Sequence, residues 1–159
     1  MGIIKHRLAR GFLDPAAGRG GTRIQTTIPT TATEWCEHYG VTVKNGVATL
    51  YKAVNDDFMS ARGVFYTPGT VPVAADWDGG KAECGSGLHF SPSPIIAKEF
   101  ALEAKKYVAC PVALADMRAP KRNDDFPHKI KARGCCAPVW ECDIWGERKA
   151  RTPTRRRVK

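Results

Sequence analysis

The dipeptide Asn45-Gly46 separates two valine-rich runs, 41–44 and 47–54, and this arrangement constrains the fold more than any other part of the chain. Asn-Gly fits the two central positions of the tightest hairpin turns, because both residues tolerate the positive φ angles of a type I′ turn. The two runs are therefore predicted to be neighbouring antiparallel strands.

The segment 94–106 has the clearest helical pattern. Ser93 is a suitable N-cap, and Pro94 fits the first helical position, where a missing N–H costs nothing. Apolar residues at helical spacing predict a buried stripe formed by Ile96, Ala97, Phe100, Ala101, Ala104 and Val108. The sequence predicts one main helix that packs on a sheet.

Shorter elements complete the pattern. Thr33 is predicted to cap a short helix in ATEWCEHY that ends at Gly40. Short strands are expected in VFYTPGTVPVA, interrupted at Pro68-Gly69, and in GLHFS, YVACPVALAD, HKIKARG and APVWECDIW. The long polar loop DWDGGKAECGSG contains Trp77, which is predicted to be a contact residue. Together these elements predict an α+β fold, with a small, twisted, mostly antiparallel sheet and one main helix.

The length of 159 residues suits one domain, predicted at 34–147. Residues 1–33 are rich in Gly, Pro and Thr and are predicted to be a flexible basic arm, and residues 148–159 are predicted to be an Arg/Lys-rich tail. No apolar run approaches the roughly 20 residues that a membrane span needs, and the start lacks the apolar core of a secretory signal. We therefore expect no membrane partner and no secretion.

The net charge of +9 lies at the two ends of the chain, because residues 24–147 hold slightly more acidic than basic residues. The predicted nucleic-acid-binding residues are Arg148, Lys149, Arg151, Arg155, Arg156, Arg157 and Lys159. The tail has no aromatic residue to stack on a base, so binding is expected to be electrostatic and poor in sequence discrimination. A solvated tail and contact with an acidic protein surface are the alternatives.

Six cysteines occur in a chain without a secretory signal, so a disulfide scaffold is not expected, and most of the thiols are expected to be small buried residues. Cys84, His89, Cys135 and Cys136 are a candidate zinc site, although the chain has no CxxC pair. Cys84 with His89 or His128 is a candidate nucleophile and base pair.

Over roughly residues 34–146 the order of motifs, above all CGSGLHFSPSP, resembles an uncharacterised family of small proteins encoded by actinobacterial bacteriophages. The resemblance implies a phage origin and a place in the host cytoplasm or the virion. With the basic ends, it suggests a phage-encoded accessory protein that acts by binding nucleic acid or nucleoprotein. A virion component or an antagonist of a host protein is the alternative.

The chain is also similar to the ADP-ribosyltransferase superfamily in the order of three motifs: Leu50-Tyr51-Lys52 on an early strand, His89-Phe90-Ser91 before a helix, and Glu141 on a late strand. Lys52 stands where Arg or His is usual in that superfamily. The similarity implies either a transferase that uses NAD or a degenerate relative of that fold. In the transferase, Lys52, His89, Ser91 and Glu141 would be catalytic, with the carboxylate stabilising an oxocarbenium-like ribose.

Overall fold

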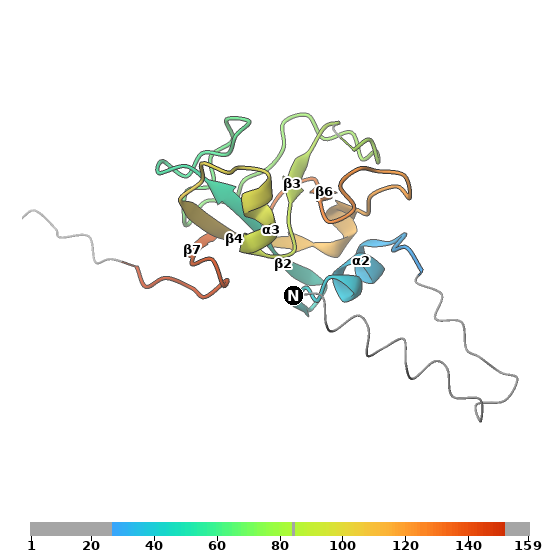
Figure 1. Cartoon of the computed structure of the whole chain (residues 1–159), viewed down its shortest axis with the longest axis horizontal. Coiled ribbons are helices and arrows are strands. Elements are labelled where there is room, and N and C mark those ends of the chain that lie inside the picture. Colours follow the sequence, from blue (N-terminus) through green and yellow to red (C-terminus); the bar gives the residue numbers. More distant parts are fainter. Residues whose placement is uncertain (1–26, 84, 152–159) are drawn as a thin grey trace, which may run out of the picture.

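The computed structural model describes residues 27–83 and 85–151, and seven strands in these residues form two antiparallel sheets (Figure 1). The four-stranded sheet has the order β1-β2-β4-β7 and consists of β1 (Val43–Lys44), β2 (Val47–Val54), β4 (Lys106–Ala113) and β7 (Trp140–Cys142). The three-stranded sheet has the order β3-β6-β5 and consists of β3 (Leu88–Phe90), β6 (Ile130–Ala132) and β5 (Met117–Arg118), the last preceded by a 3-10 turn, η2 (Leu114–Asp116). The predicted α+β class is confirmed, and its strands divide between two sheets.

The predicted hairpin is present. Asn45 and Gly46 have φ angles of 51° and 74°, and the turn places Lys44 opposite Val47. The first strand is shorter than expected, since β1 contains only two residues.

Helix α2 (Ala32–His38) has its N-cap two residues before the predicted one. Thr31, not Thr33, is the N-cap: its hydroxyl accepts a bond from the Glu34 N–H at 3.2 Å, and the Glu34 carboxylate accepts one from the Thr31 N–H at 3.2 Å. This reciprocal pair needs a Glu three residues after the cap, and only Thr31 has one. The predicted end of the helix at Gly40 is confirmed by the positive φ of Gly40, 66°.

Helix α3 (Pro94–Glu99) has the predicted Ser93 cap and Pro94 start, but it ends seven residues earlier than expected. The ring of Phe100 packs against Phe126 and His128, with centroids 5.5 and 5.4 Å away, instead of continuing a helical stripe. The following residues turn and enter β4. Tertiary packing therefore overrides a pattern that is typical of a longer helix.

In the segment VFYTPGTVPVA only the isolated bridges Met59–Phe65 and Val73–Gly134 form, so the interrupted strand predicted there is wrong.

No helix in the described residues is long and apolar enough to cross a membrane.

The four-stranded sheet buries both of its faces. One face packs against the three-stranded sheet around Leu50, Tyr66 and Phe90, and the other packs under α3 around Ala53 and Ala97 (Figure 1). Because side chains alternate along a strand, Lys52 lies on the same face of β2 as Leu50, between the two sheets.

The two sheets are joined by backbone hydrogen bonds beside Lys52. The Tyr51 N–H donates to the Ser91 carbonyl at 2.9 Å, and the Ser91 N–H donates to the Tyr51 carbonyl at 3.0 Å. This bridge fixes the middle of β2 against the end of β3, although the two segments are about forty residues apart in the chain.

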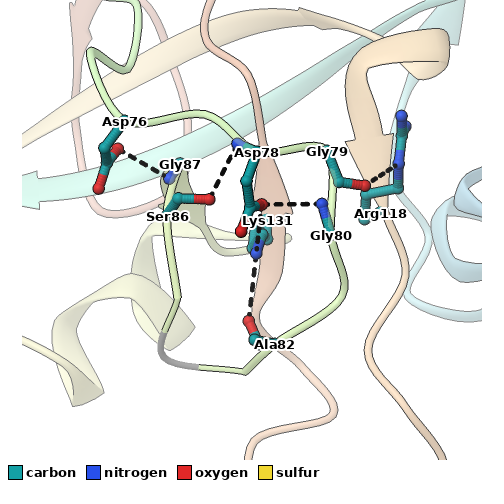
Figure 2. Close-up of polar contacts among 9 residues, drawn as sticks. All are labelled: Asp76, Asp78, Gly79, Gly80, Ala82, Ser86, Gly87, Arg118 and Lys131. Atoms are coloured by element: carbon teal, nitrogen blue, oxygen red, sulfur yellow. Dashed lines mark hydrogen bonds and ion pairs between the residues drawn. The ribbon is translucent and has the colours of Figure 1, made fainter.

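The loop between residues 76 and 87 is held in place by polar contacts (Figure 2). Asp76 accepts a bond from the Gly87 N–H at 3.0 Å, and the Asp78 N–H donates to the Ser86 hydroxyl at 3.1 Å. From the three-stranded sheet, Lys131 lies 3.6 Å from the Asp78 carboxylate.

Trp77 is half-buried within this loop. The Arg118 guanidinium lies 5.5 Å from its ring centroid and the Lys131 ammonium lies 5.7 Å from it. A Cβ built on Gly87 would lie 2.7 Å from the ring. Trp77, predicted to be a contact residue, therefore packs as an anchor of its own loop.

Candidate anion-binding pocket

A pocket of about 230 Å³, called here the Lys52 pocket, opens where the two sheets meet. Five separate segments form it: β2, the turn at 60–62, the end of β3, α3 with the residues that follow it, and Lys129 just before β6. Its twelve described lining residues are Lys52, Ala53, Ser60, Ala61, Arg62, His89, Phe90, Ser91, Ala97, Phe100, Ala101 and Lys129.

Lys52 supplies the innermost cation. Its ammonium donates a 2.6 Å hydrogen bond to the His89 carbonyl and lies 5.7 Å from the centroid of the Tyr66 ring. Burial lowers the pKa of Lys52 to about 8, and the nearby charges of Arg62 and Lys129 act in the same direction, whereas the Cys110 thiol opposes them. The described ion pairs do not include Lys52, so within this part of the chain its charge has no carboxylate partner.

His89 lines the Lys52 pocket and also a smaller hollow beside it that contains Glu83, Asp124 and Lys131. Burial, followed by the charges of Lys129, Lys52, Arg62 and Lys131, lowers the pKa of His89 to about 4. Its Nε2 atom is buried and makes no hydrogen bond to any described residue. A buried polar atom of this kind is rare in folded proteins and calls for an explanation such as a ligand.

The electrostatics of the pocket are one-sided, because its described lining contains no carboxylate. Four acids lie on neighbouring segments. Glu99 lies 3.3 Å from His128, and Asp78 lies 3.6 Å from Lys131. Glu83 and Asp124, which share a smaller hollow with His89 and Lys129, accept bonds from backbone N–H groups at 2.8 and 2.7 Å. Positive groups that converge without a counter-charge produce a potential that attracts an anion.

Phe100 forms an apolar wall of the pocket. It is packed edge to face on Phe126 and tilted on His128, and the Lys129 ammonium lies 5.7 Å from its centroid. The Lys52 pocket therefore combines cations, the buried Ser91 and the aromatic residues Phe90 and Phe100.

Of the four residues that the transferase similarity implies, the structure brings three together. Lys52, His89 and Ser91 line the same pocket. Glu141 does not: it lies two strands from β2, in the cross-strand row Lys52–Val108–Glu141, and accepts a 2.9 Å bond from Lys149. It lines a separate groove beside β7, with Trp140, Arg148 and Arg151.

The predicted zinc site includes Cys84, which lies outside the described residues, as does the thiol of the predicted nucleophile and base pair. Among the described residues no group of three or more His, Cys, Asp or Glu side chains gathers at one point. Cys135 is buried beside Cys110, while Cys136 is exposed and its thiol lies 3.6 Å from the Pro111 carbonyl. His89, Cys135 and Cys136 therefore do not form such a group among themselves.

The predicted nucleic-acid-binding tail is described only as far as Arg151, and Arg155, Arg156, Arg157 and Lys159 lie outside the described residues. The backbone of Arg148 forms an isolated antiparallel β-bridge with Cys142 of β7. The Arg148 guanidinium lies 5.1 Å from the Trp140 ring centroid. Nearby, the side chain of Trp145 is 75% exposed. The first residues of the tail thus form part of the edge of the four-stranded sheet.

Sequence reasoning missed Arg62, Lys129 and Phe100 as residues of a site. Phe100 was predicted to be core, and Arg62 lies in a polar stretch without a motif. Lys129 had a usable signal, because it lies near the start of the predicted strand HKIKARG, and in the structure it directly precedes β6. Comparisons with family models, with curated proteins and with solved structures found no match to the chain.

Proposed function

We propose that the protein binds a phosphate-bearing small molecule of the nucleotide class in the Lys52 pocket, and that NAD is one candidate. The observation that carries this proposal is the convergence of Lys52, Arg62 and Lys129 on a pocket whose described lining has no carboxylate. Lysine and arginine are the side chains that proteins use most for phosphate recognition.

The other lining groups suit the rest of such a ligand. The Ser91 hydroxyl and the neutral His89 ring supply hydrogen-bonding atoms for a sugar, and Phe100 offers a face for a ring. A volume of about 230 Å³ is below the roughly 300–1,000 Å³ of pockets that enclose drug-sized ligands. It suits one phosphate with its sugar or ring, so a dinucleotide would extend out of the mouth.

The proposal is binding and does not include transfer. An ADP-ribosyl transfer needs a carboxylate beside the reacting ribose, and Glu141 lines another groove and is paired with Lys149. The similarity to that superfamily supports a nucleotide pocket at Lys52, His89 and Ser91, but the described lining of this pocket has no carboxylate for the transfer reaction.

Calorimetric titration tests the proposal, with AMP, ADP and NAD as ligands, adenosine as the ligand without phosphate, and about 50 mM salt. We expect the phosphorylated ligands to bind and adenosine to bind at least tenfold more weakly. Lys52→Met and Lys129→Met should each weaken AMP binding ten- to a hundredfold, since a charged hydrogen bond contributes about 1.5–3 kcal/mol. Lys44→Met, at an exposed site on β1, is the matched control. Equal binding of AMP by Lys52→Met and the wild type would contradict the proposal.

A second candidate function is binding of single-stranded nucleic acid at the edge of β7. The observation that favours it is the exposed Trp145 close in sequence to Arg148 and Arg151, neither of which is in an ion pair with a described residue. An exposed tryptophan supplies the stacking surface that the tail sequence lacks.

Fluorescence anisotropy with a labelled oligonucleotide, titrated from about 50 to 200 mM salt, tests this second function. Binding through six phosphates should weaken about a thousandfold over that range. A variant that ends at Arg151 keeps the contacts of Arg148 with β7. For each phosphate contact that is lost, the slope of log K against log salt concentration should become shallower by about 0.9. Trp145→Ala should weaken binding to a single strand more than to a duplex. If neither the truncation after Arg151 nor Trp145→Ala changes the affinity for the oligonucleotide, this function is excluded.

A further inference from the structure

We propose that Lys52 is a reactive amine that forms an imine with the aldehyde group of a phosphorylated sugar held in the Lys52 pocket. This inference rests on the proposed function, because the same cations would hold the phosphate while the carbonyl carbon meets the amine. It rests on the phosphate-binding part of that function and names a different phosphorylated ligand, an aldose phosphate, because a nucleotide has no free aldehyde.

The placement of the amine is the first support. Lys52 comes from the central part of β2 and reaches the pocket between the two sheets, where its Nζ makes one hydrogen bond, to the His89 carbonyl at 2.6 Å. An ammonium has three N–H donors, so two remain for a ligand within the described surroundings. Most lysines of a protein surface point into solvent, whereas this one lines a cavity.

The charges around the amine are the second support. Arg62 and Lys129 line the same pocket, and no described lining residue is a carboxylate that would stabilise the ammonium form. A lysine that is desolvated or placed beside another cation is the usual form of an amine nucleophile in proteins.

The consequence for reactivity follows from the pKa of Lys52, which burial lowers to about 8. At pH 7.5 about a quarter of the Lys52 side chains would be neutral, compared with about a thousandth for an exposed lysine, whose pKa is about 10.4. Because only the neutral amine attacks a carbonyl, the reactive fraction is about two hundredfold larger at Lys52.

The reaction balances without an oxidant or a reductant. The nitrogen lone pair forms a bond to the carbonyl carbon, and the C=O π pair moves to the oxygen, which takes up a proton while the nitrogen loses one. The nitrogen lone pair of the resulting carbinolamine then forms C=N as its C–O bond breaks, and the departing hydroxyl takes the remaining nitrogen proton and leaves as water. Lys129 and Arg62 would hold the phosphate, so the aldehyde end is directed toward Nζ.

Reductive trapping of the full-length protein tests the inference. Glyceraldehyde 3-phosphate and its unphosphorylated counterpart glyceraldehyde are each added with sodium cyanoborohydride at pH 7.5, and the modified lysines are located by peptide mass spectrometry. We expect Lys52 to be labelled by glyceraldehyde 3-phosphate at least tenfold faster than Lys44, and at least tenfold faster than by glyceraldehyde. Inorganic phosphate should slow the labelling of Lys52 and leave that of Lys44 unchanged.

Labelling spread over exposed lysines with Lys52 no faster than Lys44 would overturn the inference, as would equal labelling of Lys52 by the two aldehydes. Both outcomes are measured in the wild-type protein, from the labelling rate of each lysine-containing peptide, so they do not depend on whether a variant folds. Lys129→Met adds a second measurement: it should slow labelling by glyceraldehyde 3-phosphate but not by glyceraldehyde. If AMP binds in the calorimetric titration while Lys52 is not labelled selectively, only this inference fails. If Lys52 is labelled with a preference for phosphate while no nucleotide binds, only the nucleotide assignment fails.

Discussion

Replacing Lys52 with methionine should stabilise the fold at neutral pH, and this gain should shrink as the pH rises. Burial lowers the pKa of Lys52 from 10.5 to about 8, so the folded state holds the charged form at a cost. At about 1.36 kcal/mol for each pKa unit, the full lowering corresponds to about 3 kcal/mol. Lys52 is only half-buried by exposed area, so solvent screening reduces the expected effect to about 1–3 kcal/mol.

The direction of the pH dependence follows from proton binding. Between pH 8 and 10.5 the unfolded chain still holds the Lys52 proton and the folded chain has lost it, so this group makes the folded state more stable as the pH rises. Well below pH 8 both states hold the proton and the cost is constant. The methionine side chain of the variant has no proton to exchange. The difference in unfolding free energy between variant and wild type should therefore fall from neutral pH to about pH 10.

Urea unfolding at about pH 7 and about pH 10 measures this difference, with Lys44→Met as the control at an exposed position. Burial raises the pKa of Tyr66 and of Cys110, which reduces the stability of both chains at alkaline pH. Because Lys52 lowers the pKa of Cys110, its removal enlarges the Cys110 contribution in the variant and makes the difference fall in the same direction. A difference that is the same at both pH values would refute the reasoning, because it would show that the fold does not carry an uncompensated charge at Lys52.

Four further outcomes are expected. Gly87→Ala should reduce the free energy of unfolding by about 2–3 kcal/mol, because its φ is 94° and the new Cβ would meet Trp77. Gly46→Ala, with a positive φ but open space, should cost about 1 kcal/mol in the same denaturant titration. Ser93→Ala removes the cap of α3 and should cost about 1 kcal/mol, measured by thermal unfolding; no change would mean that the helix end is held by packing alone. Glu141→Gln should leave AMP affinity within about twofold of the wild type in calorimetry, and a tenfold loss would place this carboxylate in the site after all.

The parts of the fold that local chemistry determines were predictable. Asn45-Gly46 determines its turn through backbone conformation, and Ser93-Pro94 starts α3 through a side-chain cap and a fixed φ, so both features are confirmed. The predicted end of α3 was wrong because its cause is not local. Phe100 finds Phe126 and His128 from a distant loop, and no periodicity within 94–106 contains that information.

Some residues of the candidate site were predictable from the sequence, and others depend on long-range packing. Lys52, His89 and Ser91 were named from motif order, and the structure places all three in one pocket. Arg62 and Lys129 were not named, because their role depends on the meeting of two sheets, which follows from long-range pairing. Glu141 was named with the first three but lies in another groove, since motif order carries no information on which groove a carboxylate lines.

The Tyr51–Ser91 bridge has a consequence for how a ligand would enter. Lys52 follows one bridged residue and Ser91 is the other, so two walls of the pocket belong to one hydrogen-bonded backbone unit. Separating them requires breaking two backbone hydrogen bonds that lie beside buried core. The site is therefore expected to hold its shape before a ligand arrives, and the ligand loses little affinity to ordering of the protein. The amide hydrogens of Tyr51 and Ser91 should exchange with solvent as slowly as those of the central strands, with or without ligand.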